Sequence, residues 1–223
     1  MYIEVNGIDM YYECIGEGNS IILLHGNTNS TGYMKFLGNK LKDKYKIYLI
    51  DRRCCGKSEK NCDLSYEETA KDIFEFIQKL NLDKPIIIGS SGGATVAMYI
   101  AINYPENVSK IVLCSGVARK NAVKIPAYAK FLDSFKWYPG KKDNDRFYNL
   151  VETSKDLTSD DLSKIQCETL VVNGSKDIVS VSEAEFLHQN IRNSELLILE
   201  KETHTSYLVR IKWMDKLNSF LEK

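Results

Sequence analysis

The sequence is poor in several features that would point to particular functions. Histidine occurs three times and proline four times among 223 residues, and 30 Lys and Arg residues balance 30 Asp and Glu residues. Because the net charge is zero, no long-range field favours binding to nucleic acid or to an anionic membrane surface. No window is apolar enough to predict a membrane span, and the start, Met1 to Glu4, carries an acid where a secretory signal needs a basic and then an apolar segment. We expect a soluble chain without a nucleic-acid or membrane partner, and its oligomeric state is not readable from these features.

The cysteines lack the spacing of a metal site and the context of a small disulfide-stabilised scaffold. They are Cys14, Cys54, Cys55, Cys62, Cys114 and Cys167. A reducing cytoplasm therefore fits best, and we expect neither a metal ion nor another cofactor. Hydrophobic residues make up 43% and charged residues 27% of the chain, which is typical of globular proteins, and a chain of this length can bury one good core.

Short β-rich runs alternate with helical patterns along most of the chain. This alternation predicts an α/β fold with a mostly parallel, doubly wound sheet, because helical crossovers connect parallel strands. Tyr2 to Val5 and Met10 to Ile15, joined across Asn6-Gly7, predict an opening antiparallel hairpin. Short apolar runs predict the buried strands of the sheet's body, which are Ile21 to Leu24, Lys46 to Ile50, Pro85 to Ile88, Ile111 to Cys114, Thr169 to Val172 and Leu196 to Leu199. The expected covering helices include Tyr66 to Leu80, Glu183 to Asn190 and Tyr207 to Leu221.

Residues 118–162 interrupt this alternation of strands and helices. They contain two expected helices and an aromatic-rich centre before the turn-like Pro139-Gly140. We interpret this stretch as a short helical cap inserted between the two parts of the core, residues 1–117 and 163–223. Thr158 resembles a helix N-cap, since acids follow it in the first turn. We expect most of the aromatic residues of the cap to pack it onto the sheet and one or two to line a pocket. These aromatic residues are Tyr128, Phe131, Phe135, Trp137, Tyr138, Phe147 and Tyr148.

The most informative window, residues 85–97, reads as an apolar strand, then Gly-x-Ser-x-Gly, then a helix. A serine at such a tight turn is pushed out above the sheet, and small residues two positions before and after it let the chain segments approach closely. Glycines occupy both positions around Ser91, whereas Ser90 would put Ile88 at the crowded position. We therefore interpret Ser91 as a catalytic nucleophile. A glycine-rich turn or a phosphate-binding loop is the alternative, although the lysine that a P-loop needs does not follow.

An acid and a histidine follow Ser91 in the chain order of a serine, acid and histidine triad. Asp177 and His204 each lie in a loop just past an expected strand, at the edge where open α/β sheets meet ligands. The remaining histidines have the wrong place or order, since His25 precedes Ser91 and His188 falls within a helical pattern. An acid in an ordinary turn and an ordinary surface or core histidine are the alternative interpretations.

Four motifs in this order resemble those of the α/β-hydrolase superfamily, near its lid-bearing, esterase-like branch, and the resemblance covers nearly the whole chain. Leu23-Leu24-His25-Gly26-Asn27 resembles the family's His-Gly segment, which implies that the backbone N–H of Asn27 is one donor of an oxyanion hole. The resemblance implies the backbone N–H of Gly92 as the second donor. Asp51 to Ser58 resembles a structural turn, usually Asp-x-Arg-Gly-x-Gly-x-Ser, in which Cys54 replaces a glycine. We expect a strained or altered turn there.

These residues and the resemblance predict a serine hydrolase in which Ser91 attacks an acyl carbonyl, His204 takes its proton and Asp177 orients the imidazole. We expect a carboxylic ester of a small, partly apolar molecule as the substrate. Thioester, lactone and carbon–carbon bond hydrolysis use the same residues and stay open, as does a non-catalytic ligand-binding role. A serine nucleophile disfavours the dehalogenase and epoxide-hydrolase branches, which use an aspartate.

Overall fold

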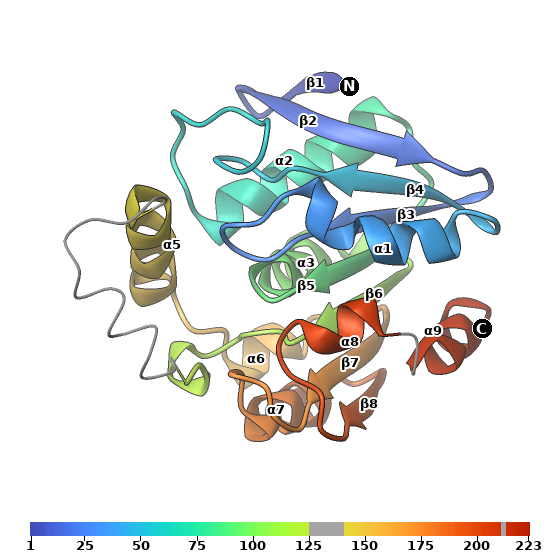
Figure 1. Ribbon diagram of the computed structural model, residues 1–223, viewed down its shortest axis with the longest axis vertical. Helices are drawn as coiled ribbons and strands as arrows, with labels where there is room; N and C mark the ends of the chain where they lie inside the picture. Colours follow the sequence, from blue (N-terminus) through green and yellow to red (C-terminus); the bar gives the residue numbers. More distant parts are fainter. Residues whose placement is uncertain (125–140, 211–212) are drawn as a thin grey trace.

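Helices cover both faces of a central mixed sheet. The computed structural model describes residues 1–124, 141–210 and 213–223, except the side chains of residues 141–144. Figure 1 shows the layers, with the N-terminal strands at one edge of the sheet and the C-terminal strand at the other. This arrangement confirms the predicted α/β fold with a doubly wound, mostly parallel sheet.

Within the described residues the sheet has eight strands in the order β1-β2-β4-β3-β5-β6-β7-β8. β1 pairs with β2 and β2 with β4 in antiparallel fashion, whereas every pairing from β4 across to β8 is parallel. The strands are β1 (Tyr2–Val5), β2 (Ile8–Ile15), β3 (Asn19–Leu24), β4 (Tyr45–Ile50), β5 (Ile86–Ser90), β6 (Lys110–Cys114), β7 (Glu168–Gly174) and β8 (Ser194–Leu199). The predicted hairpin and all six predicted body strands are confirmed. The turn residues of the hairpin, Asn6 and Gly7, have φ of +45° and +74°, as a tight hairpin turn requires.

Alternate side chains of the parallel strands enter two hydrophobic cores, one on each face of the sheet. In β3, Ile22 and Leu24 pack into one core and Ile21 and Leu23 into the other, and all four are fully buried. Because successive side chains of a strand point to opposite faces, a strand that is covered on both faces must be apolar throughout. This is why the strands appear in the sequence as continuous apolar runs.

The helices divide between the two faces. α2, α3, α5, α6 and α7 contribute to the first core, and α1, α8 and α9 to the second. The helices are α1 (Thr31–Leu41), α2 (Tyr66–Lys79), α3 (Gly92–Asn103), α5 (Lys141–Thr153), α6 (Ser159–Leu162), α7 (Val181–Asn190), α8 (Ser206–Val209) and α9 (Met214–Leu221), with short 3-10 turns η1 (Pro105–Asn107) and η2 (Lys120–Ala122). In the described ranges, none of them combines the length and the apolar character that a membrane span needs.

A buried ion pair ties the turn after β4 to α2. Arg53 and Asp72 are joined by two hydrogen bonds of 2.7 and 2.6 Å, and their side chains are only 3% and 0% exposed. Burial raises the pKa of Asp72 against the opposing effect of Arg53. The turn passes through Cys54 with φ of +62°, which confirms the strain predicted where cysteine replaces glycine.

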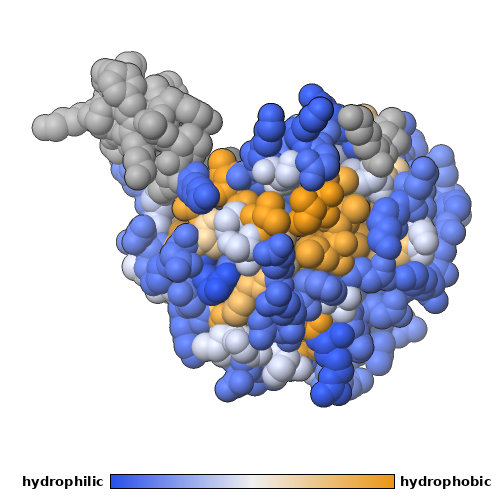
Figure 2. Space-filling view, turned by 90° about the horizontal axis from the view of Figure 1, so that it is seen from below, coloured by the Kyte–Doolittle hydropathy of each residue, from blue (hydrophilic) through white to orange (hydrophobic). Residues whose placement is uncertain are grey.

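Two predictions for the C-terminal part were wrong. The expected single helix from Tyr207 to Leu221 is two helices, α8 and α9, and Arg210 after α8 has extended backbone angles (φ −108°, ψ +131°). The last strand was expected to be buried, but β8 forms an edge of the sheet and all its residues are half-buried. Figure 2 views the molecule from the side on which β8 and α7 lie in Figure 1 and shows hydrophobic residues gathered near the centre of that face. Apolar content identifies a strand but not its place in the sheet.

The segment between β6 and β7 contains η2, α5 and α6, and Figure 1 shows α5 lying beside the layers. α6 begins after Thr158, whose hydroxyl accepts a hydrogen bond from the Asp161 N–H while the Asp161 carboxylate accepts one from the Thr158 N–H. The predicted N-cap is therefore confirmed as a capping box. Of the aromatic residues predicted for the cap, Phe147 is buried and Tyr148 half-buried. The others, Tyr128, Phe131, Phe135, Trp137 and Tyr138, lie outside the described residues.

Candidate active site

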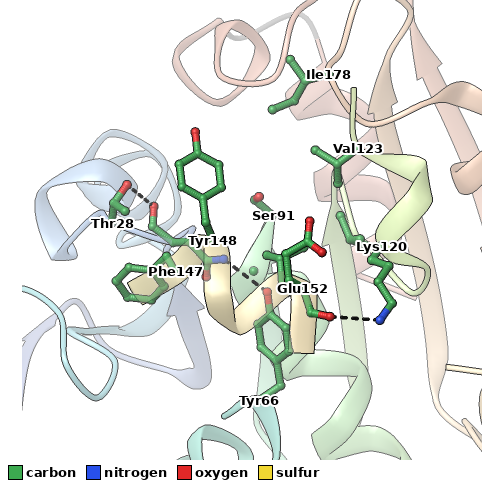
Figure 3. A pocket seen from close by; sticks show the side chains of 13 residues that line it. Thr28, Tyr66, Ser91, Lys120, Val123, Phe147, Tyr148, Glu152 and Ile178 are labelled. Carbon is green, nitrogen blue, oxygen red and sulfur yellow. Dashed lines mark hydrogen bonds between the residues drawn. The ribbon is translucent and has the colours of Figure 1, made fainter. Parts of the chain in front are cut away.

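Ser91 lies at the turn between β5 and α3, just past the carboxyl end of the strand. Its backbone has φ of +52° and ψ of −122°, a strained conformation for a residue other than glycine. Its N–H donates to the carbonyl oxygen of Cys114 on the neighbouring β6, at 2.8 Å. The Ser91 side chain points into a cavity (Figure 3), whereas Ser90 is fully buried. Of the two adjacent serines, Ser91 is thus the one that a ligand can reach.

The turn needs glycine on both sides of Ser91 because the chain segments nearly touch there. A Cβ atom on Gly89 would lie 2.3 Å from the carbonyl oxygen of Gly93. A Cβ atom on Gly93 would lie 2.3 Å from the carbonyl oxygen of Leu24. Real Cβ contacts are not that short, so the steric reasoning that selected Ser91 over its neighbour holds in the structure.

Asp177 and His204 follow the carboxyl ends of β7 and β8 and are hydrogen bonded, with 2.7 Å between Oδ1 and Nδ1. The buried Asp177 carboxylate also accepts bonds from the Ser115 hydroxyl at 2.6 Å and the Val179 N–H at 2.9 Å. Burial alone would raise the pKa of Asp177, but the hydrogen bond and charge of His204, followed by the other two bonds, lower it. The acid therefore stays ionised and accepts a hydrogen bond from Nδ1 of His204.

Ser91, Asp177 and His204 lie at the same edge of the sheet because all three follow the carboxyl ends of parallel strands. Among the described residues, no hydrogen bond joins the Ser91 hydroxyl to His204. The structure therefore pairs the acid with the histidine but does not bring the histidine into hydrogen-bond contact with the serine.

His25 is buried next to the turn that follows β4. It is fully buried, and its Nε2 accepts a hydrogen bond of 3.2 Å from the Arg52 N–H. Burial, and then the charge of Arg52, lower the pKa of His25 to about 3. His25 is therefore neutral near pH 7.

Asn27 and Gly92 lie side by side in the cavity wall. The Asn27 amide is held at both ends, because Oδ1 accepts from Arg52 Nη2 at 3.0 Å and Nδ2 donates to the Tyr66 hydroxyl at 3.2 Å. It fills the space beside Gly92, where a Cβ atom would lie 2.1 Å from Asn27 Oδ1. Within the described part of the chain, no acceptor takes a hydrogen bond from the backbone N–H of Asn27 or Gly92. Both N–H groups belong to residues that line the cavity beside Ser91.

A cavity of about 340 Å³ opens in front of Ser91. Figure 3 shows Phe147, Tyr148 and Glu152 of α5 along one wall, with Val123 and Ile178 on another. The volume is near the lower end for small-molecule sites, and most of its lining is apolar. In the described ranges, no group of three or more His, Cys, Asp or Glu side chains is arranged to hold a metal ion.

Several supporting residues were not singled out from the sequence. The Ser115 hydroxyl contacts both Asp177 and the buried Tyr207 hydroxyl, and it directly follows β6. That position, the first residue past a buried strand, is the signal that could have identified it. Arg52 and Tyr66, which hold Asn27, carry no comparable signal because their partner lies far away in the sequence.

Comparison with known proteins identifies the family of this chain. A sequence profile described as "alpha/beta hydrolase fold" matches residues 19–166, more than half of the chain. The chain belongs to the α/β-hydrolase fold family. The matched stretch of this α/β hydrolase includes the segments that carry Asn27, Ser91 and Gly92.

This α/β hydrolase is similar to named proteins over almost its whole length. Serine hydrolase BPHL of Mus musculus is 27% identical over an alignment 248 positions long, which covers 99% of this chain and 84% of the mouse protein. The structure of the esterase EaEST from Exiguobacterium antarcticum is 26% identical with a TM-score of 0.81, covering 100% of this chain and 99% of the esterase. The enol-lactonase of Burkholderia xenovorans LB400, 18% identical with a TM-score of 0.80 and covering 100% of both chains, shares the fold.

Proposed function

We propose that this α/β hydrolase cleaves a carboxylic ester or related acyl bond of a small, partly apolar substrate through an acyl-enzyme. The observation that carries the proposal is Ser91 at a strained turn facing the cavity, with the bonded Asp177 and His204 at the same edge of the sheet. Its similarity to a serine hydrolase and to an esterase supports the same chemistry.

In the proposed reaction, the Ser91 oxygen attacks the acyl carbonyl while Nε2 of His204 takes the hydroxyl proton. Asp177 stabilises the imidazolium that forms, and His204 then gives the proton to the leaving alcohol. Water attacks the acyl-enzyme in the second half, with His204 again as the base. The hydrogen bond between Ser91 and His204 is expected to form in the substrate complex, since such bonds are often long in free enzymes and tighten on binding.

The backbone N–H groups of Asn27 and Gly92 are the proposed oxyanion hole. Donors placed where negative charge develops lower the barrier by about 3 kcal/mol each in comparable sites. Their value depends on rigidity, and the anchoring of the Asn27 amide by Arg52 and Tyr66 supports this role. Arg52 is itself 1% exposed, so its guanidinium is a fixed support.

We further propose that residues 118–162 act as a cap over a core formed by residues 1–117 and 163–223. α5 supplies one wall of the cavity, with Phe147 and Tyr148 as its aromatic residues. A cavity of about 340 Å³ is near the lower end for small-molecule sites, which supports a small molecule as the substrate.

The primary test is labelling with a fluorophosphonate probe, which reacts with activated serines. We expect wild type and Ser90→Ala to be labelled and Ser91→Ala to remain unlabelled, because only Ser91 reaches the cavity. Circular dichroism serves as the control that both variants fold. Labelling that persists in Ser91→Ala would place the nucleophile elsewhere, and a wild type that never reacts would favour a non-catalytic binding protein.

Substrate size is tested with p-nitrophenyl esters of increasing acyl length. Each methylene that the cavity accommodates should raise kcat/KM by up to about fourfold, the equivalent of about 0.8 kcal/mol, until the cavity is full. We expect the gain to stop at short acyl chains. A steady rise out to the palmitate ester would contradict the small-cavity proposal while leaving the serine mechanism in place.

A further inference from the structure

Two cysteines approach each other in the loop after β4, outside the proposed catalytic residues. The sulfur atoms of Cys54 and Cys62 lie 2.6 Å apart, and the Cys54 thiol also contacts the Cys62 carbonyl oxygen at 3.3 Å. The loop between them is closed by a backbone hydrogen bond of 2.9 Å from Cys54 to Glu59. Cys54 is buried and Cys62 half-buried, so oxidants can reach Cys62 first.

The surroundings of the pair are basic on the side of α5. Arg146 donates to the carbonyl oxygens of Lys60, at 2.8 Å, and of Cys62. Burial, and then the adjacent Cys62 thiol, raise the pKa of Cys54 to about 12, and the charge of Arg146 opposes this increase. The guanidinium thus partly offsets the effect of burial on the Cys54 thiol, and the thiolate is the reactive form of cysteine.

We propose that Cys54 and Cys62 are a peroxide-sensitive dithiol that closes to a disulfide and so fixes the loop on which α5 rests. The Cys62 thiolate attacks one oxygen of hydrogen peroxide and the O–O bond breaks, so that Cys62 becomes a sulfenic acid and the leaving hydroxide takes up the proton lost by the thiol to give water. The Cys54 sulfur then attacks the Cys62 sulfur, the S–S bond forms and a second water leaves. Two thiols are oxidised, one peroxide is reduced, and the sulfur atoms need to move only about 0.5 Å closer to reach disulfide length.

The link would act on the cap through Arg146. This residue belongs to α5, which lines the cavity, and two of its hydrogen bonds go to carbonyl groups inside the loop. A disulfide would restrain the Cys62 carbonyl group, and with it the hydrogen bond by which Arg146 holds α5 to the loop. The chemistry of the pair does not depend on the proposed hydrolase activity, so each can be tested alone.

The test is oxidation of the purified protein with equimolar hydrogen peroxide, followed by intact mass and tryptic mapping. We expect a loss of about 2 Da, reversed by dithiothreitol, and a cross-link between tryptic fragments 54–57 and 61–71. Cys62→Ser should abolish the link, whereas Cys55→Ala and the half-buried control Cys167→Ser should keep it. A link that uses Cys55, or no loss of mass, would overturn the proposal.

A second variant guards against failures of folding. Cys54→Gly places the residue best suited to φ of +62° at that position, so the loop should keep its shape. With no second thiol, Cys62 should stop at the sulfenic acid and become labelled by dimedone, whereas wild type should escape labelling. Amide hydrogen exchange of α5 should also slow after oxidation in wild type but not in Cys54→Gly, with α9 as the unaffected reference. Unchanged exchange in α5 would overturn the proposed effect on the cap.

Discussion

Replacing Gly92 with alanine tests the proposed oxyanion hole without removing a donor atom. The added Cβ would lie 2.1 Å from Asn27 Oδ1, and contacts under 3.0 Å force a shift. The Asn27 amide must therefore move by about 1 Å, away from a position held by Arg52 and Tyr66. We expect the backbone N–H of Asn27 to move with the displaced side chain, and a displacement of that size at a catalytic group can cost about 10²-fold in rate.

We therefore expect Gly92→Ala to lower kcat by about 10²-fold, or about 3 kcal/mol in barrier, with a smaller effect on KM. Stability should also fall, by about 1 kcal/mol, because the displaced Asn27 amide weakens its hydrogen bonds with Arg52 and Tyr66, although alanine itself suits the first turn of α3. The matched control is Gly32→Ala in α1, where the new Cβ meets nothing closer than Ser30 Oγ at 3.8 Å. Steady-state ester hydrolysis and thermal unfolding provide the two measurements.

A double-mutant cycle separates the steric cause from other effects of alanine at position 92. In Asn27→Ala the clashing amide is absent while the backbone N–H remains, so adding Gly92→Ala should cost less than about threefold. The reasoning is refuted if Gly92→Ala costs the same factor in both backgrounds, or if the single variant keeps wild-type kcat.

Two further predictions concern stability. Asp72→Asn leaves Arg53 as an uncompensated buried charge and should lower the free energy of unfolding by about 3 kcal/mol in urea titrations. The control is Glu68→Gln, which should cost under about 1 kcal/mol because Glu68 is 3.9 Å from Arg53 and 34% exposed. Similar losses in both variants would show that the buried pair contributes no more than the exposed one. The pKa of His25 is lowered to about 3 in the folded chain, against an ordinary value of 6.5. Between these two pH values the unfolded chain binds one proton more than the folded chain. The free energy of unfolding should therefore fall by about 1.4 kcal/mol for each pH unit of acidification. His25→Asn should reduce that slope by one proton, and an unchanged slope would exclude His25 as its source.

Much of the fold could be predicted because the signals are local. A strand that is buried on both faces must be apolar throughout, the Asn6-Gly7 pair supplies the positive φ of a hairpin, and Thr158 followed by Asp161 forms a capping box. The choice of Ser91 was also local, since close chain contacts on both sides require glycine at fixed positions. Each of these follows from residues near each other in the sequence.

Other predictions failed where the answer depended on distant neighbours. Whether β8 lies inside the sheet or at its edge depends on which strands flank it, and its apolar residues are compatible with both. The sequence has a helical pattern that continues across Arg210, but the extended backbone of Arg210 ends α8. Periodicity does not record such a break.

The sequence by itself therefore determined the class of fold, the strained serine turn and the chain order of Ser91, Asp177 and His204, because these depend on local sterics and on strand ends. Tertiary structure decided which residues support them. Ser115 contacts Asp177 only because β6 and β7 are neighbours in the sheet. The hydrogen bonds that Asn27 makes with Arg52 and Tyr66 likewise form only because the fold brings segments far apart in the sequence to one edge of the sheet. Pairwise contacts of that kind produce no periodic pattern in a single sequence.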